Sequence, residues 1–117
     1  MLEINAIRSD DGTQIDLCPA GELDAYSVAQ FREAFAEMAE EPRVVVNLSG
    51  VQFMDSAGLG ALIGGIRRIR ESDGRVVIFS DRDAITKLLH TTGFDRIVPV
   101  KDDYAGAIAA LDEDPDA

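Results

Sequence analysis

The residues best suited to chemistry lie in one short segment, Asp55-Ser56-Ala57-Gly58-Leu59-Gly60, between a hydrophobic run and an amphipathic one. We expect Ser56 to cap a helix there, because a hydroxyl at that position accepts a hydrogen bond from a free N–H and contributes about 1 kcal/mol. The glycines leave the backbone open to close approach, although each costs the helix roughly 1 kcal/mol relative to alanine. Helix stability alone does not account for them.

Known phosphate-binding and catalytic motifs do not fit this segment. A dinucleotide-binding fingerprint beginning at Gly58-Leu59-Gly60 would need a third small residue at Ile63. A P-loop read from Gly60 to Gly65 would need Lys and then Ser or Thr, where the chain has Ile66-Arg67. A nucleophile elbow lacks its first glycine, and the single histidine, His90, has no evident serine partner.

An exposed serine at the start of a helix is instead suited to carry a phosphate. The modification adds about −1.5 to −2 charges, which the helix dipole and free N–H groups tolerate. A partner covering the same place would meet repulsion beside Asp55, and a penalty near ~4 kcal/mol lowers affinity about a thousandfold. The segment therefore suits a binding switch. The simpler alternative is that Asp55-Ser56 only caps the helix and that the glycines allow tight packing.

The composition describes one acidic globular domain. The chain has 117 residues and a formal net charge of −11, and 46% of its residues are hydrophobic, so we expect a domain over residues 1–111 and a frayed acidic tail over 112–117. Nucleic acid is excluded as a partner because its binding needs an excess of Lys and Arg. No apolar run reaches the ~18 residues of a membrane span, and no signal peptide is evident, so we expect a cytoplasmic protein.

The sequence offers no support for catalysis or for a cofactor. One cysteine and one histidine cannot assemble a zinc site, and Asp10-Asp11 and Asp102-Asp103 are typical of solvated turns or caps. Cys18 lies in an alternating stretch, which favours a small buried residue over a reactive thiol. We therefore predict a protein that is not an enzyme and holds no metal.

The hydrophobic pattern predicts an α/β fold after an opening hairpin. Strands are expected over residues 2–6, 15–19, 44–48, 75–79 and 97–100, and helices over 25–40, 57–71, 83–91 and through Tyr104, Ile108 and Leu111. The strand over 44–48 is expected to continue loosely through Val51 and Phe53.

Three motifs in this order resemble the STAS domain, and more specifically the bacterial anti-sigma factor antagonists. They are Gly21-Glu22-Leu23-Asp24 before the first helix, Asp55-Ser56-Ala57-Gly58-Leu59-Gly60 after the central strand, and Thr92-Gly93-Phe94 after the third helix. The resemblance covers nearly the whole chain. It implies a mixed sheet of about four or five strands with about four helices mainly on one face.

The resemblance also implies a partner-switching cycle. The unmodified antagonist binds an anti-sigma factor that is an ATP-dependent serine kinase, which frees the sigma factor. The kinase phosphorylates the serine matching Ser56, the phosphorylated form lets go, and a metal-dependent serine phosphatase resets it. Asp24 matches an acidic position beside that serine, and Ala57 stands where many relatives have Ser or Thr. The implied partner-binding residues are Gly21, Glu22, Asp24, Asp55, Ser56, Ala57, Gly58, Leu59 and Gly60.

Several alternatives stay open at this point. A STAS scaffold or accessory subunit of a signalling or lipid-transport complex would use the same surface without phosphorylation. A nucleotide-binding module would use the turn from Gly58 to Gly65. Asp24 is equally explained as an N-cap of the first helix, with Gly21 allowing a turn, and the Arg67, Arg68 and Arg70 cluster as a solvated face or a rim contact. The resemblance suggests a monomer, although an exposed edge strand could pair.

Overall fold

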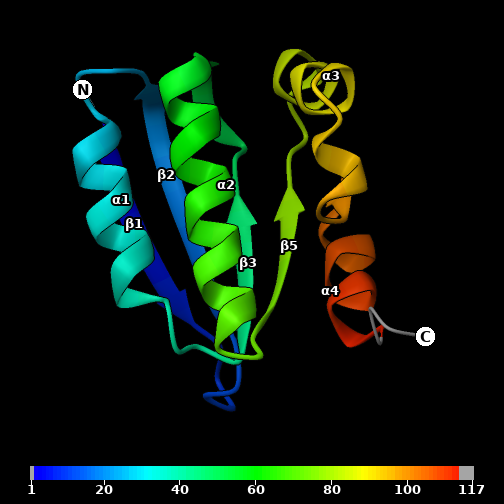
Figure 1. Ribbon diagram of the computed structural model, residues 1–117. Coiled ribbons are helices and arrows are strands. Elements are labelled where there is room, and N and C mark those ends of the chain that lie inside the picture. Colours follow the sequence, from blue (N-terminus) through cyan, green and yellow to red (C-terminus); the bar gives the residue numbers. More distant parts are fainter. Residues whose placement is uncertain (1, 114–117) are drawn as a thin grey trace.

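Six strands and four helices make up the fold in a computed structural model that describes residues 2–113 (Figure 1). The strands are β1 (Glu3–Arg8), β2 (Ile15–Leu23), β3 (Arg43–Asn47), β4 (Gly50–Met54), β5 (Arg75–Phe79) and β6 (Val100–Lys101). The helices are α1 (Val28–Glu37), α2 (Ser56–Glu71), α3 (Asp83–Thr91) and α4 (Tyr104–Asp112), with a 3-10 turn η1 (Phe94–Arg96).

The strands form one mixed sheet in the order β1-β2-β3-β5-β6. The predicted opening hairpin is confirmed, because β1 and β2 are antiparallel, whereas every later pairing is parallel. Strand β2 has two partners on its other side. Its first residues, Ile15–Leu17, pair with β3, and its last, Ala20–Leu23, pair with β4.

Alternation along the strands divides the buried side chains between two faces. Val44 and Val46 lie in the main core with Phe31 of α1, and the other strands and helices α2 and α3 also contribute side chains to this core. Val45 points to the other face and packs in a small second core with residues of α4. The predicted fold class, a mixed α/β sheet with helices mainly on one face, is therefore confirmed, although the sheet has six strands instead of the expected four or five and α4 lies on the opposite face.

Three elements differ from the sequence prediction. Strand β2 runs on to Leu23, and β4 is a separate strand beside it rather than a continuation of β3, because the chain turns at residues 48–49. Helix α1 is shorter than expected. Residues 97–99 are not a strand, since the N–H groups of Ile97 and Val98 donate to the Phe94 carbonyl of η1.

The last helix reaches into the segment predicted as a tail. Helix α4 ends at Asp112, whose carboxylate lies 2.6 Å from the Arg43 guanidinium. Residues 114–117 of the predicted tail lie outside the described residues.

Candidate functional site

Helix α2 is capped by Asp55 and not by Ser56, so the predicted capping role of Ser56 is wrong. Asp55 has extended backbone angles, and its Oδ1 accepts hydrogen bonds from the N–H groups of Ala57 (2.9 Å) and Gly58 (3.1 Å). Ser56 already has helical geometry and is the first residue of the helix. A carboxylate caps a helix as well as a hydroxyl does, and its negative charge also interacts favourably with the positive end of the helix dipole.

Because Asp55 is the cap, the Ser56 hydroxyl has no structural task. The side chain is exposed, and its Oγ makes no hydrogen bond to any residue in the range 2–113. The N–H groups of Ala57 and Gly58 are already bound by Asp55. A group attached to Ser56 would therefore lie toward solvent instead of folding back onto the helix end.

Gly58 holds the start of α2 against the end of β2. A Cβ added at Gly58 would lie 2.6 Å from the Leu23 carbonyl oxygen and 3.0 Å from Met54 Cγ, so no larger residue fits without displacement. The Asp55 N–H donates to the same Leu23 carbonyl (3.1 Å). By contrast, a Cβ at Gly60 would meet nothing within 4 Å. Gly58 is needed for packing, whereas Gly60 keeps an open surface.

The Gly21–Asp24 motif reaches the same place through an irregular strand end. Gly21 has φ +119°, a backbone conformation that favours glycine, at the position where the pairing of β2 with β4 shifts register. The expectation that Gly21 allows a turn is therefore wrong, because it forms a bulge within β2. Beyond it, Glu22 is exposed and pairs with Phe53 of β4.

Asp24 caps a turn and does not itself begin α1. Its Oδ1 accepts from the N–H groups of Tyr26 (2.9 Å) and Ser27 (3.1 Å), and the N-cap of α1 is Ser27. Asp24 is therefore not the N-cap of α1 that the sequence led us to expect, because residues 25–27 form a turn between Asp24 and the helix. The Ser27 hydroxyl fixes this turn further by donating to the Glu22 carbonyl (2.6 Å).

The fold therefore gathers two of the three sequence motifs. The contacts of Leu23 with Asp55 and Gly58 join the end of β2 to the start of α2, and this defines a surface that we call the serine surface. It consists of the predicted residues Gly21, Glu22, Asp24, Asp55, Ser56, Ala57, Gly58, Leu59 and Gly60. The third motif is structural, since Gly93 ends α3 with φ +79° and Phe94 is 2% exposed in the core.

Two exposed aromatic residues beside the serine surface were not predicted from the sequence. Tyr26 is 98% exposed, although its N–H is held by Asp24, and Phe53 is 51% exposed beside Glu22. Exposed aromatic side chains on a fixed backbone are typical of binding surfaces. The sequence feature that could have indicated this contact is the position of Tyr26, an aromatic residue two positions after Asp24 in a turn where the core does not need it.

The charged groups of this surface are mainly acidic. Glu22, Asp24 and Asp55 contribute carboxylates, and the exposed Arg67 lies further along α2. Arg70, which we grouped with Arg67 in the sequence, instead donates to the Ile97 carbonyl at another edge of the fold. The surface therefore fits a partner with basic groups, and such a partner gains both affinity and orientation from them.

Groups for metal or thiol chemistry do not gather here. Within residues 2–113, no cluster of three or more His, Cys, Asp or Glu side chains could hold a metal ion. Cys18 is half-buried rather than buried as predicted, and burial raises the pKa of its thiol, which favours the unreactive protonated form.

No helix in the described part of the chain is long and apolar enough to cross a membrane.

Comparison with known proteins identifies the family of this chain. The model of the STAS domain family matches residues 6–107, and the chain belongs to this family. The anti-sigma-B factor antagonist of Listeria monocytogenes is 32% identical over 97 residues, which cover 81% of this chain and 85% of that protein.

Solved structures show the same fold. The crystal structure of an anti-sigma factor antagonist from Mycobacterium paratuberculosis has a TM-score of 0.86 at 21% identity and covers 97% of this chain and 96% of that one. The structure of the Bacillus cell fate determinant SpoIIAA in its phosphorylated form has a TM-score of 0.67 at 20% identity and covers 92% and 97% of the two chains.

Proposed function

We propose that this protein is an anti-sigma factor antagonist whose unphosphorylated form binds an anti-sigma factor serine kinase and thereby releases a sigma factor. The names of its relatives support the class of activity. The observation that carries the proposal is the Ser56 hydroxyl, which is exposed and free of hydrogen bonds at the first residue of α2. We assign the serine surface as the docking site, and the protein acts as a regulatory binding partner rather than as an enzyme.

The small residues around Ser56 let the kinase reach its hydroxyl. Ala57 is a small residue, and nothing lies within 4 Å of a Cβ placed at Gly60, so a partner can approach the backbone of the first turn. The Ser56 Oγ attacks the γ-phosphorus of ATP held by the kinase. An O–P bond forms, the bond to the β-phosphate oxygen breaks, ADP leaves, and the hydroxyl proton passes to a base of the kinase or to water.

The phosphate then weakens binding for an electrostatic reason. The Asp55 carboxylate already accepts hydrogen bonds from the N–H groups of Ala57 and Gly58. These two donors are therefore not available to offset the charge of the phosphate. It stands beside the Asp55 carboxylate and against the partner, where repulsion and desolvation of about 4 kcal/mol would lower affinity about a thousandfold. A metal-dependent serine phosphatase would hydrolyse the ester and restore binding.

Mass spectrometry of the protein from its native host tests this proposal. We expect an added mass of about 80 Da, equal to one phosphoryl group, that fragments to Ser56 and disappears after treatment with a serine phosphatase. Absence of this mass during growth, starvation and stress, together with a stable co-purifying partner, would instead favour a scaffold or accessory subunit that binds without a phosphorylation cycle.

A further inference from the structure

The outer edge of β5 carries backbone groups that the fold leaves unpaired. The Arg75 N–H donates toward β3, to the Pro42 carbonyl (2.9 Å), whereas the Ile78 N–H donates to the other side, to the Pro99 carbonyl (2.9 Å). Because backbone groups alternate between the two neighbours of a parallel strand, the N–H and C=O of Val76 face the same side as those of Ile78. Within the described residues they have no backbone partner there.

The chain that precedes β6 cannot fill these positions. If the parallel pairing of β5 with β6 continued toward the beginning of both strands, the Val76 N–H would donate to the Ile97 carbonyl. The Val76 carbonyl would accept from the N–H of residue 99. Residue 99 is Pro99, which has no N–H to give to the Val76 carbonyl. The Ile97 carbonyl, which would accept from Val76, is bonded by the Arg70 guanidinium.

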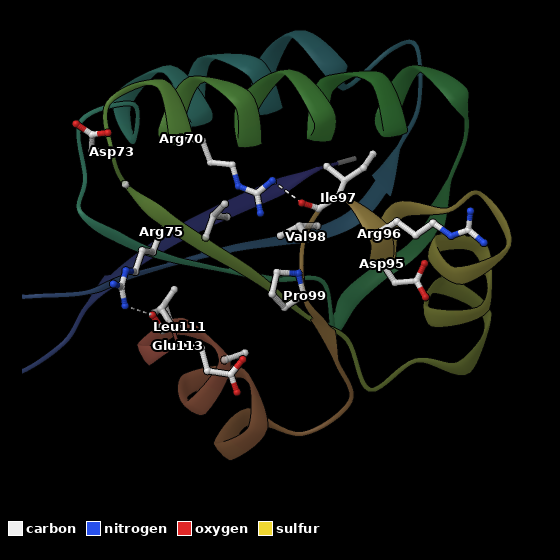
Figure 2. A pocket seen from close by; sticks show the side chains of 13 residues that line it. Arg70, Asp73, Arg75, Asp95, Arg96, Ile97, Val98, Pro99, Leu111 and Glu113 are labelled. Atoms are coloured by element: carbon white, nitrogen blue, oxygen red, sulfur yellow. Dashed lines mark hydrogen bonds between the residues drawn. The ribbon is translucent and has the colours of Figure 1, made fainter. Parts of the chain in front are cut away.

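A cavity of about 850 Å³ lies at this unpaired edge (Figure 2). Its walls come from the end of α2, the start of β5, the segment 97–99 and the end of α4, and we call it the β5 groove. The volume lies within the range of ~300–1,000 Å³ that is usual for ligand sites. The groove is at the C-terminal end of α2, whereas Ser56 is at its N-terminal end.

Two arginines are fixed on opposite sides of the β5 groove. Arg70 on α2 donates to the Ile97 carbonyl, and Arg75 of β5 donates to the Leu111 carbonyl of α4 (3.2 Å), as Figure 2 shows. Neither guanidinium forms an ion pair with a carboxylate of residues 2–113. Each therefore keeps N–H donors and a full positive charge for an anionic ligand.

The acidic side chains near the groove do not cancel these charges. Asp95 is bonded to His90 Nδ1 (2.7 Å) on the side away from Arg75. Asp73 and Glu113 are exposed, and in Figure 2 their carboxylates lie away from the two guanidinium groups. The anion-binding part of the groove thus consists of Arg70 and Arg75, which line it together with Val76.

We propose that the β5 groove binds an extended acidic peptide segment of a partner protein, which adds to the open edge of β5 at Val76 and sets its carboxylates against Arg70 and Arg75. Addition of a strand to a sheet edge satisfies both free backbone groups at once. Neighbouring side chains of an extended peptide point to opposite faces, so two consecutive acidic residues would meet the two arginines. This binding does not depend on the function proposed for Ser56.

Fluorescence anisotropy of the full chain with a labelled Val-Thr-Asp-Glu-Thr-Val peptide tests the groove. We expect saturable binding that weakens about tenfold or more in Arg70→Gln and in Arg75→Gln, because each loses a charge-assisted contact. Arg67→Gln removes the same charge from the same helix outside the groove and should leave binding within about twofold of the unchanged protein. The same peptide with Lys-Lys in place of Asp-Glu should not bind.

The backbone part of the proposal has its own readout. Peptide binding should slow hydrogen exchange of the Val76 amide, and N-methylation of the pairing residue of the peptide should abolish binding. If Arg75→Gln does not fold, Arg70→Gln and the N-methylated peptide decide the question. The proposal is overturned if the acidic peptide does not saturate, or if neither arginine variant weakens it. It is also overturned if binding occurs only after removal of residues 114–117, since the groove would then belong to the chain's own Asp114 and Asp116.

Discussion

The backbone carbonyl of Leu23 lies 2.6 Å from the place where a Cβ on Gly58 would stand. The same carbonyl accepts a hydrogen bond from the Asp55 N–H (3.1 Å). One peptide group of β2 therefore contacts the first turn of α2 at its N-cap, Asp55, and also at Gly58. The position of Ser56 relative to Asp24 follows from this contact.

Substitution Gly58→Ala should therefore destabilise the fold. The added methyl group would overlap backbone, which cannot move as a side-chain end can, and we expect a loss of about 1–3 kcal/mol in the free energy of unfolding. Gly60→Ala is the matched control and should be neutral or stabilising by up to about 1 kcal/mol, because its site is open and alanine favours the helix. Urea unfolding of both variants measures the difference, and equal effects would contradict the close contact.

Substitutions at Asp55 can separate its role as the N-cap of α2 from the effect of its negative charge. Asp55→Ala removes the acceptor for two N–H groups and should lower stability by about 1 kcal/mol, whereas Asp55→Asn keeps a good cap and should cost less. If the Asp55 charge takes part in the switch, phosphorylated Asp55→Asn should retain more affinity for the kinase than the phosphorylated parent. Thermal unfolding and partner binding are the two measurements.

Variants of Ser56 should affect binding without affecting the fold. Because the hydroxyl makes no hydrogen bond to a described residue, Ser56→Ala and Ser56→Asp should both unfold within about 0.5 kcal/mol of the parent. Ser56→Ala should bind the kinase and resist release by ATP, and Ser56→Asp, with one negative charge, should bind more weakly. Equal binding of Ser56→Asp and the parent at low salt would contradict the electrostatic explanation.

Tyr26 should be a main contact of the partner. Tyr26→Ala is expected to weaken binding of the kinase by about 2 kcal/mol or more, close to thirtyfold, while the fold is unchanged because the side chain is 98% exposed. Ile7→Ala is the control, since Ile7 is 59% exposed on β1, away from the serine surface. Calorimetric titration would show whether only the first variant loses affinity.

Acid should remove a contribution to stability that comes from the β1–β2 turn. Hydrogen bonds from the Ser9 hydroxyl and from the N–H and hydroxyl of Thr13 lower the pKa of Asp11 from 3.8 to about 2. A lowered pKa in the folded state means that the contribution is complete above pH 3.8 and is lost as the pH falls through about 2.

Asp11→Ala should accordingly melt below the parent at neutral pH, and the gap in melting temperature should close as the pH approaches about 2. Asp10→Ala changes an exposed neighbour with no hydrogen bond to a described residue and should show no such closing gap. A gap that stays constant with pH would show that Asp11 acts through packing and not through its charge.

The sequence predicted the regular elements better than the details of the site. Apolar spacing located α2 because one face of this helix is buried, and a continuous run of β-branched residues located β5 because this strand is buried on both faces. It missed the separate strand β4, since pairing of β2 with two partners depends on contacts distant in the chain. Asp55 and Ser56 are both good caps, so only the backbone geometry could decide between them.

The exchange of partners along β2 has a mechanical consequence for signalling. The end of β2 near the serine surface is bonded to β4, while its beginning is bonded to β3 and, through β3, to β5. Leu23 and Val51 of the β2–β4 ladder are fully buried, as are Val46 and Ile78 of the β3–β5 ladder, so both parts of the sheet hold the serine surface in place. We therefore expect the serine surface to keep its shape when a kinase binds, because the Ser56 side chain is already exposed before the two proteins meet.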